Sequence, residues 1–109
     1  MPVQIEISAG RLPATIEATA YFVVAEALTN VAKHARAASA AVAARVQNGT
    51  LRVEVRDDGV GGARPDGSGL QGLRDRLAAL DGQLQVECPA DGGTLVVATI
   101  PIPTSGIER

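Results

Sequence analysis

The dipeptide Asn48-Gly49 constrains the fold of this chain more than any other feature of its sequence. Both residues accept positive φ angles, and the pair is typical of the two-residue turns that join antiparallel strands. Directly after it, apolar and charged residues alternate through Leu51–Arg56, as in a strand with one buried face. The alanine-rich segment Ala40–Val46 then becomes the partner strand, although the propensity of alanine alone would allow a helix. A hairpin at the centre of the chain excludes an all-helical fold.

Two further elements are predicted before the hairpin. In Val3–Ile7, apolar residues alternate with Gln4 and Glu6, which predicts a strand with one buried face. The segment Ala14–Ala38 contains neither Gly nor Pro and ends in basic residues, so it predicts a long helix. The residues expected on its buried stripe are Ile16, Ala20, Val24, Ala27, Leu28, Val31 and Ala35.

After the hairpin the sequence predicts a glycine-rich loop over Asp57–Gly67. A second helix is expected to begin at Ser68 and to stop at Gly82. Alternating apolar residues then predict a strand from Leu84 to Cys88, and a last strand covers Thr94–Ile100.

This order of elements predicts an α+β two-layer sandwich. Strands paired through hairpins, with helices interposed, favour a mixed and mostly antiparallel sheet with both helices on one face. A chain of 109 residues suits one domain with one core. We expect that domain to span residues 1–103 and residues 104–109 to form a disordered tail.

Composition and charge exclude several functions. The net charge is −2 and no basic run occurs, so nothing indicates a direct nucleic-acid partner or an anionic membrane surface. Tyr21 and Phe22, the only aromatic residues, are too few to stack successive bases. No apolar stretch is long enough to span a membrane, and a single cysteine, Cys88, fits a reducing compartment. These features predict a cytoplasmic location.

The first helix carries a candidate polar site. Glu26, Asn30 and Lys33 follow one another at spacings of four and three, so they share one stripe of the helix. A carboxylate, an amide oxygen and an ammonium group together could hold a metal ion and the phosphates that it neutralises. An ordinary solvated helix face would have the same spacing. His34, taken alone, fits a structural role.

The glycine loop carries a second candidate site. Asp57 ends a strand and is followed by Gly59 and Gly61, which let the backbone approach a ligand closely. A carboxylate at this place can accept a hydrogen bond from an exocyclic amine such as that of adenine. Because Asp and Gly are also common turn residues, the pattern alone fits an ordinary turn equally well.

The spacing of Gly67, Gly69 and Gly72 matches the GxGxxG pattern of dinucleotide-binding loops, with Glu87 about 20 residues further on. Two features oppose that interpretation. The preceding strand ends ten residues before Gly67, and the hairpin order provides no succession of parallel strand-helix-strand units.

Taken together and in this order, four segments resemble the ATP-binding domain of the GHKL superfamily, which includes gyrase, heat-shock chaperones, histidine kinases and MutL. The segment YFVVAEALTNVAKHA resembles the N box of histidine kinases, DDGVGG the first glycine box, GSGLQGLRDR the second, and GGT the third. The resemblance covers roughly Val3–Ile102 and implies the Bergerat ATPase fold. The short stretch between the glycine boxes is similar to that of the NarX/DesK/LiaS-like subfamily of sensor kinases, which signals to LuxR-type response regulators.

The resemblance implies a role for each matching position. Asn30 would hold the Mg²⁺ that bridges the ATP phosphates, and Glu26 would orient or deprotonate the attacking imidazole. Asp57 would bind the adenine amine, with Thr94 joining it through a water. The other implied ATP-binding residues are Lys33 and His34 at the phosphates, Gly59 and Gly61 in the pocket floor, and Gly67, Gly69, Leu70 and Gly72 in a lid.

The implied activity is transfer of the ATP γ-phosphate to a histidine on a separate dimerisation domain, with a LuxR-type response regulator as the next partner. His34 cannot be the acceptor, because it belongs to the nucleotide-binding helix itself. We therefore expect this chain to be the catalytic domain, monomeric by itself, of a longer and membrane-anchored sensor. Two alternatives stay open: a serine kinase switch of the anti-sigma-factor type, and a non-catalytic nucleotide-binding module.

Overall fold

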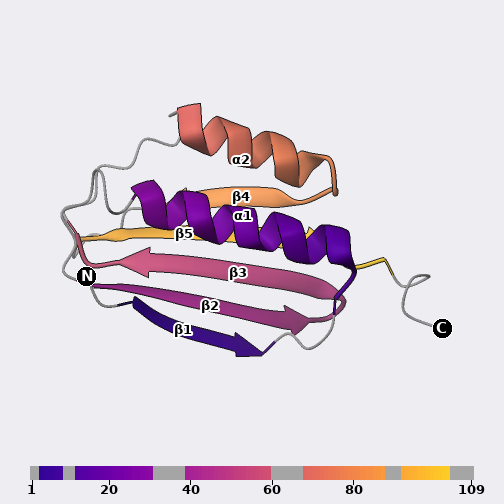
Figure 1. Cartoon of the computed structure of the whole chain (residues 1–109), viewed down its shortest axis with the longest axis horizontal. Coiled ribbons are helices and arrows are strands. Elements are labelled where there is room, and N and C mark those ends of the chain that lie inside the picture. The colour runs from indigo at the N-terminus through magenta and orange to yellow at the C-terminus, as the bar shows by residue number, and fades with distance from the viewer. Residues whose placement is uncertain (1–2, 9–11, 31–38, 60–67, 88–91, 104–109) are drawn as a thin grey trace.

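The computed structural model describes residues 3–8, 12–30, 39–59, 68–87 and 92–103. These residues form five strands and two helices, drawn in Figure 1. The elements are β1 (Val3–Ser8), α1 (Ala14–Asn30), β2 (Ala40–Gln47), β3 (Thr50–Asp57), α2 (Ser68–Ala78), β4 (Gln83–Glu87) and β5 (Thr94–Pro101). All seven elements were predicted from the sequence. The expected continuation of the first helix over 31–38 and the expected tail lie outside the described residues.

The strands form one mixed sheet in the order β1-β2-β3-β5-β4. Only β1 and β2 pair in parallel, because α1 carries the chain back across the sheet between them. The other three pairs are antiparallel. Asn48 and Gly49 have φ angles of 52° and 74°, as the predicted two-residue turn requires.

Both helices cover the same face of the sheet, which makes the predicted two-layer α+β sandwich (Figure 1). The core lies between these layers and is almost entirely aliphatic, because alternate residues of each strand point toward the helices. Its centre is formed by Val23, Ala27, Leu73 and Leu77 from the helices and by Leu51, Val53, Val55, Val96, Ala98 and Ile100 from the strands. Ile16 and Ala27 of the predicted helix stripe are buried. Val23 is completely buried as well, although the predicted stripe does not include it.

Two arginines attach α2 to its neighbours. The guanidinium of Arg76 lies over the Phe22 ring of α1, with 3.9 Å from Cζ to the ring centroid. Arg74 donates a hydrogen bond of 3.0 Å from Nη1 to the carbonyl oxygen of Leu84 in β4. The helix ends at Ala78; in the turn after it Asp81 has a φ of 60°, and the amide of Gly82 bonds back to the carbonyl of Leu77. The residue in the left-handed conformation is thus Asp81 and not the glycine at which the sequence places the stop.

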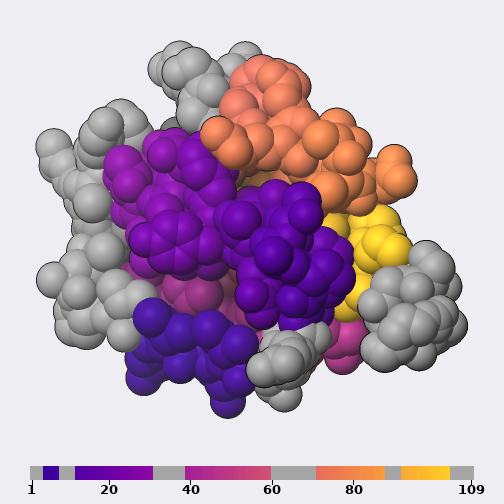
Figure 2. All heavy atoms as spheres, turned by 45° about the vertical axis from the view of Figure 1, so that its right-hand side comes forward, coloured from indigo at the N-terminus to yellow at the C-terminus, as the bar shows by residue number. Residues whose placement is uncertain are grey.

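The predicted burial of β1 is wrong, although the strand itself is confirmed. Ile5 and Ile7 are 63% and 66% exposed. They pair in register with Val42 and Ala44 of β2, so they lie on the helix-covered side of the sheet. However, β1 is the edge strand, and α1 contacts β3 and β5 in the middle of the sheet. Figure 2 shows β1, in indigo, beyond the margin of α1.

This edge position predicts that Ile7→Thr changes the free energy of unfolding by less than about 0.5 kcal/mol, because the side chain is mostly in water in both states. In contrast, Val53→Thr buries a hydroxyl in the core and should cost roughly 1–3 kcal/mol. Val53 is 1% exposed and is also a β-branched strand residue, which makes it a matched control. Urea unfolding curves of the two variants compare the costs directly. A loss at Ile7 as large as that at Val53 would contradict the edge assignment.

No helix in the described part of the chain is long and apolar enough to cross a membrane.

Candidate functional site

The aliphatic face of the sheet changes character at one end. Along β3, the apolar row of Leu51, Val53 and Val55 continues with Asp57, which is in register with Ala40 of β2 and Thr94 of β5. Asp57 and Thr94 are each only 5% exposed, and they are the buried polar residues of the described chain. A carboxylate and a hydroxyl thus stand side by side where the core pattern would place two more aliphatic side chains.

The Asp57 carboxylate is held through one of its oxygens. Oδ1 accepts a hydrogen bond of 2.7 Å from the amide of Gly59, and the carbonyl of Gly59 accepts one of 3.0 Å from the amide of Gly93. The start of the glycine loop is therefore tied to the start of β5. The second carboxylate oxygen is left for another donor, as recognition of an amine requires.

Thr94 supplies the clearest sign that the site is built for a ligand. Its hydroxyl oxygen is buried and has no hydrogen-bond partner among the described residues. A buried hydroxyl without a partner costs free energy, so such groups normally bond to a ligand or an ordered water. Its place beside Asp57 fits a polar heterocycle that carries both a donor and an acceptor.

Gly93 allows β5 to approach β3 closely at this point. Its φ is +85°, and a Cβ atom built on it would collide with the Asp57 carbonyl oxygen. Only glycine meets both conditions without strain. In the sequence the pair Gly92-Gly93 fits an ordinary turn, and no local signal reveals its contact with Asp57.

The carboxyl end of α1 lies at the same end of the domain as the end of β3 and the start of β5 (Figure 1). Asn30 is the last described residue of this helix, and Glu26 lies one turn earlier; both are half-buried. The fold thus brings Glu26 and Asn30 of the predicted polar stripe to the same end of the domain as Asp57 (Figure 1). Within the described chain, no three His, Cys, Asp or Glu side chains cluster as a metal site.

The other predicted site residues divide into two groups. Gly69, Leu70 and Gly72 lie in the first turns of α2. Lys33, His34, Gly61 and Gly67 lie outside the described residues.

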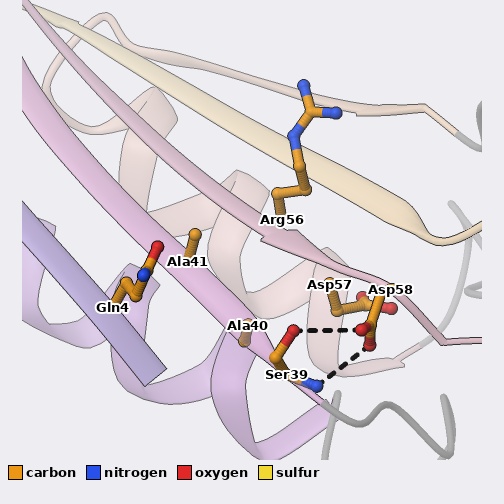
Figure 3. A pocket seen from close by; sticks show the side chains of 7 residues that line it. All are labelled: Gln4, Ser39, Ala40, Ala41, Arg56, Asp57 and Asp58. Carbon is orange, nitrogen blue, oxygen red and sulfur yellow. Dashed lines mark hydrogen bonds between the residues drawn. The ribbon is translucent and has the colours of Figure 1, made fainter. Parts of the chain in front are cut away.

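Asp58, to which the sequence assigns no role, follows Asp57 directly and is exposed. It lines a hollow of about 260 Å³ on the open face of the sheet, together with Gln4, Ser39 and Arg56 (Figure 3). Asp57 lines this hollow too, so the hollow reaches the end of β3, where Asp57 is in register with Thr94.

The fold is that of an ATPase domain. The chain belongs to the histidine kinase-, DNA gyrase B- and HSP90-like ATPase family, whose model matches residues 15–104. Within that family it matches the ATP-binding catalytic domain of sensor histidine kinases.

Two curated relatives and one solved structure illustrate the match. The chain is 35% identical over 98 residues to the signal transduction histidine-protein kinase/phosphatase DegS of Brevibacillus brevis, covering 86% of this chain and 25% of that protein. It is 34% identical over 100 residues to the oxygen sensor histidine kinase NreB of Staphylococcus carnosus, covering 87% and 29%. The blue-light activated histidine kinase of Erythrobacter litoralis EL346 superposes with a TM-score of 0.72 at 30% identity, covering 92% of this chain and 35% of that structure. The chain thus spans between a quarter and a third of the length of these curated relatives.

Proposed function

We propose that this domain binds Mg-ATP and transfers the γ-phosphate to a histidine of a separate dimerisation domain, from which a response regulator takes it. The observation that carries the proposal is the buried Asp57 carboxylate beside the buried Thr94 hydroxyl, which has no hydrogen-bond partner in the described part of the chain. This pair supplies an acceptor for the adenine amine and a polar group for a neighbouring ring nitrogen, directly or through a water. An aliphatic core next to it provides the apolar surface that a flat base requires.

The phosphate end of the nucleotide is assigned to the end of α1. Asn30 offers an amide oxygen as the protein ligand of Mg²⁺, which when bound neutralises charge on the phosphates. Lys33 and His34, next along the chain, are proposed to contact phosphate oxygens. Gly61 and Gly67, together with Gly69, Leu70 and Gly72, are proposed as the floor and lid around the triphosphate.

Glu26 is the proposed catalytic carboxylate. In the transfer, a ring nitrogen of the acceptor imidazole forms a bond to the γ-phosphorus while the bond from that phosphorus to the ADP oxygen breaks. Glu26 orients the imidazole and accepts the proton that its ring must lose. Phosphoryl transfer depends mainly on positioning and charge neutralisation. Glu26, Asn30 and the proposed lid would therefore be enough to catalyse it.

The magnesium assignment predicts a specific defect for Asn30→Ala. The variant should bind ATP roughly tenfold more weakly in the presence of Mg²⁺ and about equally well in EDTA, since a charge-assisted contact of this kind contributes about 1–3 kcal/mol. Titration calorimetry with and without Mg²⁺ measures both affinities. An equal loss in the two conditions would show that Asn30 acts on the fold or on the base and not on the metal.

The partners follow from the same proposal. The acceptor is the helical dimerisation domain of the parent kinase, and a LuxR-type response regulator is the expected receiver of the phosphate. We place the dimerisation domain and the response regulator in the cytoplasm, because the reaction consumes ATP and the cytoplasm supplies it.

Transfer itself is tested by incubating the domain with γ-labelled ATP and the dimerisation domain of the parent protein. We expect label on the acceptor that is stable to alkali and lost in acid, as a phosphorus–nitrogen bond requires. Label that survives acid would indicate a serine kinase, and ATP binding without any transfer would indicate a nucleotide-binding module.

A further inference from the structure

Ser39 and Asp58 form a compact hydrogen-bonded pair next to the proposed adenine site. The Ser39 amide donates to Asp58 Oδ1 and the Ser39 hydroxyl donates to Asp58 Oδ2, each at 3.0 Å (Figure 3). The Asp58 amide in turn donates to the Ser39 carbonyl at 3.3 Å. We call these three contacts the Ser39–Asp58 clip.

The clip continues the pairing of β2 and β3 by one position. The last strand pair in register is Ala40 with Asp57, and Ser39 with Asp58 follows it directly. A hairpin end of this kind would ordinarily fray, because its outer residues face water and lack further partners. Here the side chain of Asp58 replaces the next strand pair with two hydrogen bonds of its own.

From this geometry we propose that Asp58 is a positioning residue that aims the Asp57 carboxylate at the adenine amine. This inference rests on the proposed binding of ATP. Asp58 lies between Asp57 and Gly59, whose amide holds Asp57 Oδ1. Fixing residue 58 therefore fixes the peptide planes on both sides, which set the direction of the Asp57 side chain and of the Gly59 amide. The same contacts direct both oxygens of the Asp58 carboxylate to Ser39.

Three substitutions separate this role from others. Asp58→Ala removes both side-chain hydrogen bonds of the clip. Asp58→Asn preserves them without the charge, because its amide oxygen accepts from the Ser39 backbone and the rotatable Ser39 hydroxyl accepts from its amide nitrogen. Ser39→Ala removes only the hydroxyl contact and leaves the carboxylate in place.

The decisive readout is discrimination between ATP and purine riboside triphosphate, which lacks the 6-amino group. The wild-type domain should prefer ATP by roughly tenfold or more, because the amine bonds to a charged acceptor. Asp58→Ala should reduce that preference by about threefold to tenfold, through weaker ATP binding with little change for the other nucleotide. Asp58→Asn should retain the wild-type ratio, and Ser39→Ala should lie between. A merely structural role would weaken both nucleotides equally.

Calorimetric titrations of the four proteins with the two nucleotides give these ratios, and Ser39→Ala, the milder change, decides the matter if Asp58→Ala does not fold. If Asp58→Ala prefers ATP over purine riboside triphosphate as strongly as the wild type does, the positioning role is overturned while ATP binding stays intact. Where only Ser39→Ala folds, an unchanged preference in that variant has the same consequence. Tighter ATP binding by Asp58→Asn would also overturn it, since the charge and not the clip would then control affinity. If the wild-type protein itself fails to discriminate, the adenine site of the proposed function falls, and the inference falls with it.

Discussion

Asp57→Asn is expected to weaken ATP binding roughly 10- to 100-fold, the largest loss of affinity that a single isosteric change should cause here. The asparagine oxygen can still accept the hydrogen bond from the Gly59 amide, so the local backbone is retained. Its amide nitrogen then occupies the position of the second carboxylate oxygen. That nitrogen is a donor, and it would face the donor amine of adenine in a buried site. Titration calorimetry at fixed Mg²⁺ measures the change.

Asp81→Asn provides the matched control for this loss. Asp81 undergoes the same chemical change, is exposed, and lies in the turn after α2. Its positive φ suits asparagine equally well, so neither folding nor ATP binding should change. If Asp57→Asn binds ATP as tightly as this control, the carboxylate does not recognise the base and the proposed orientation of ATP is wrong.

Gly93→Ala is expected to destabilise the domain by at least about 3 kcal/mol, a large part of the 5–15 kcal/mol that is typical of a whole domain. Two costs add. A φ of +85° is unfavourable for alanine, and the new methyl group would overlap the Asp57 carbonyl, which is backbone and cannot turn aside. Either β5 moves away from β3 or the hairpin end is displaced. Urea or thermal unfolding measures the loss.

Gly92→Ala distinguishes overlap from backbone strain. Gly92 also has a positive φ, of +104°, but the nearest atom to its added methyl group is the Gly59 carbonyl oxygen at 3.8 Å, an ordinary contact. This variant should lose only the strain energy, about 1–2 kcal/mol. Equal losses at Gly92 and Gly93 would mean that close approach of β5 to Asp57 is not what requires glycine at position 93.

The predicted and observed structures agree where short-range rules decide the outcome. The turn at Asn48-Gly49 predicts a strand for an alanine-rich segment whose propensity alone would allow a helix, and β2 confirms that strand. The candidate site residues could be predicted from the sequence for a similar reason. The order of the four motifs identifies the family, and Asp57 is recognisable as a carboxylate that follows an apolar alternation.

The errors and omissions share a different cause. The alternation in β1 indicates two distinct faces, but it carries no information on whether a helix reaches far enough to cover one of them. Ile5 and Ile7 therefore lie exposed at the sheet edge. Likewise, the clip between Ser39 and Asp58 joins residues 19 positions apart, and it exists only because the hairpin register brings them opposite one another.

The sequence by itself determined the elements, their order, the α+β class and the family, because periodicity, turn residues and motif order are properties of neighbouring positions. The tertiary structure alone decided the strand order, which side chains leave water, and which backbone atoms meet where β3 ends and β5 begins. Burial and close approach depend on segments far apart in the chain. That is why Asp57, Thr94 and Gly93 become one site only when β3 and β5 lie side by side.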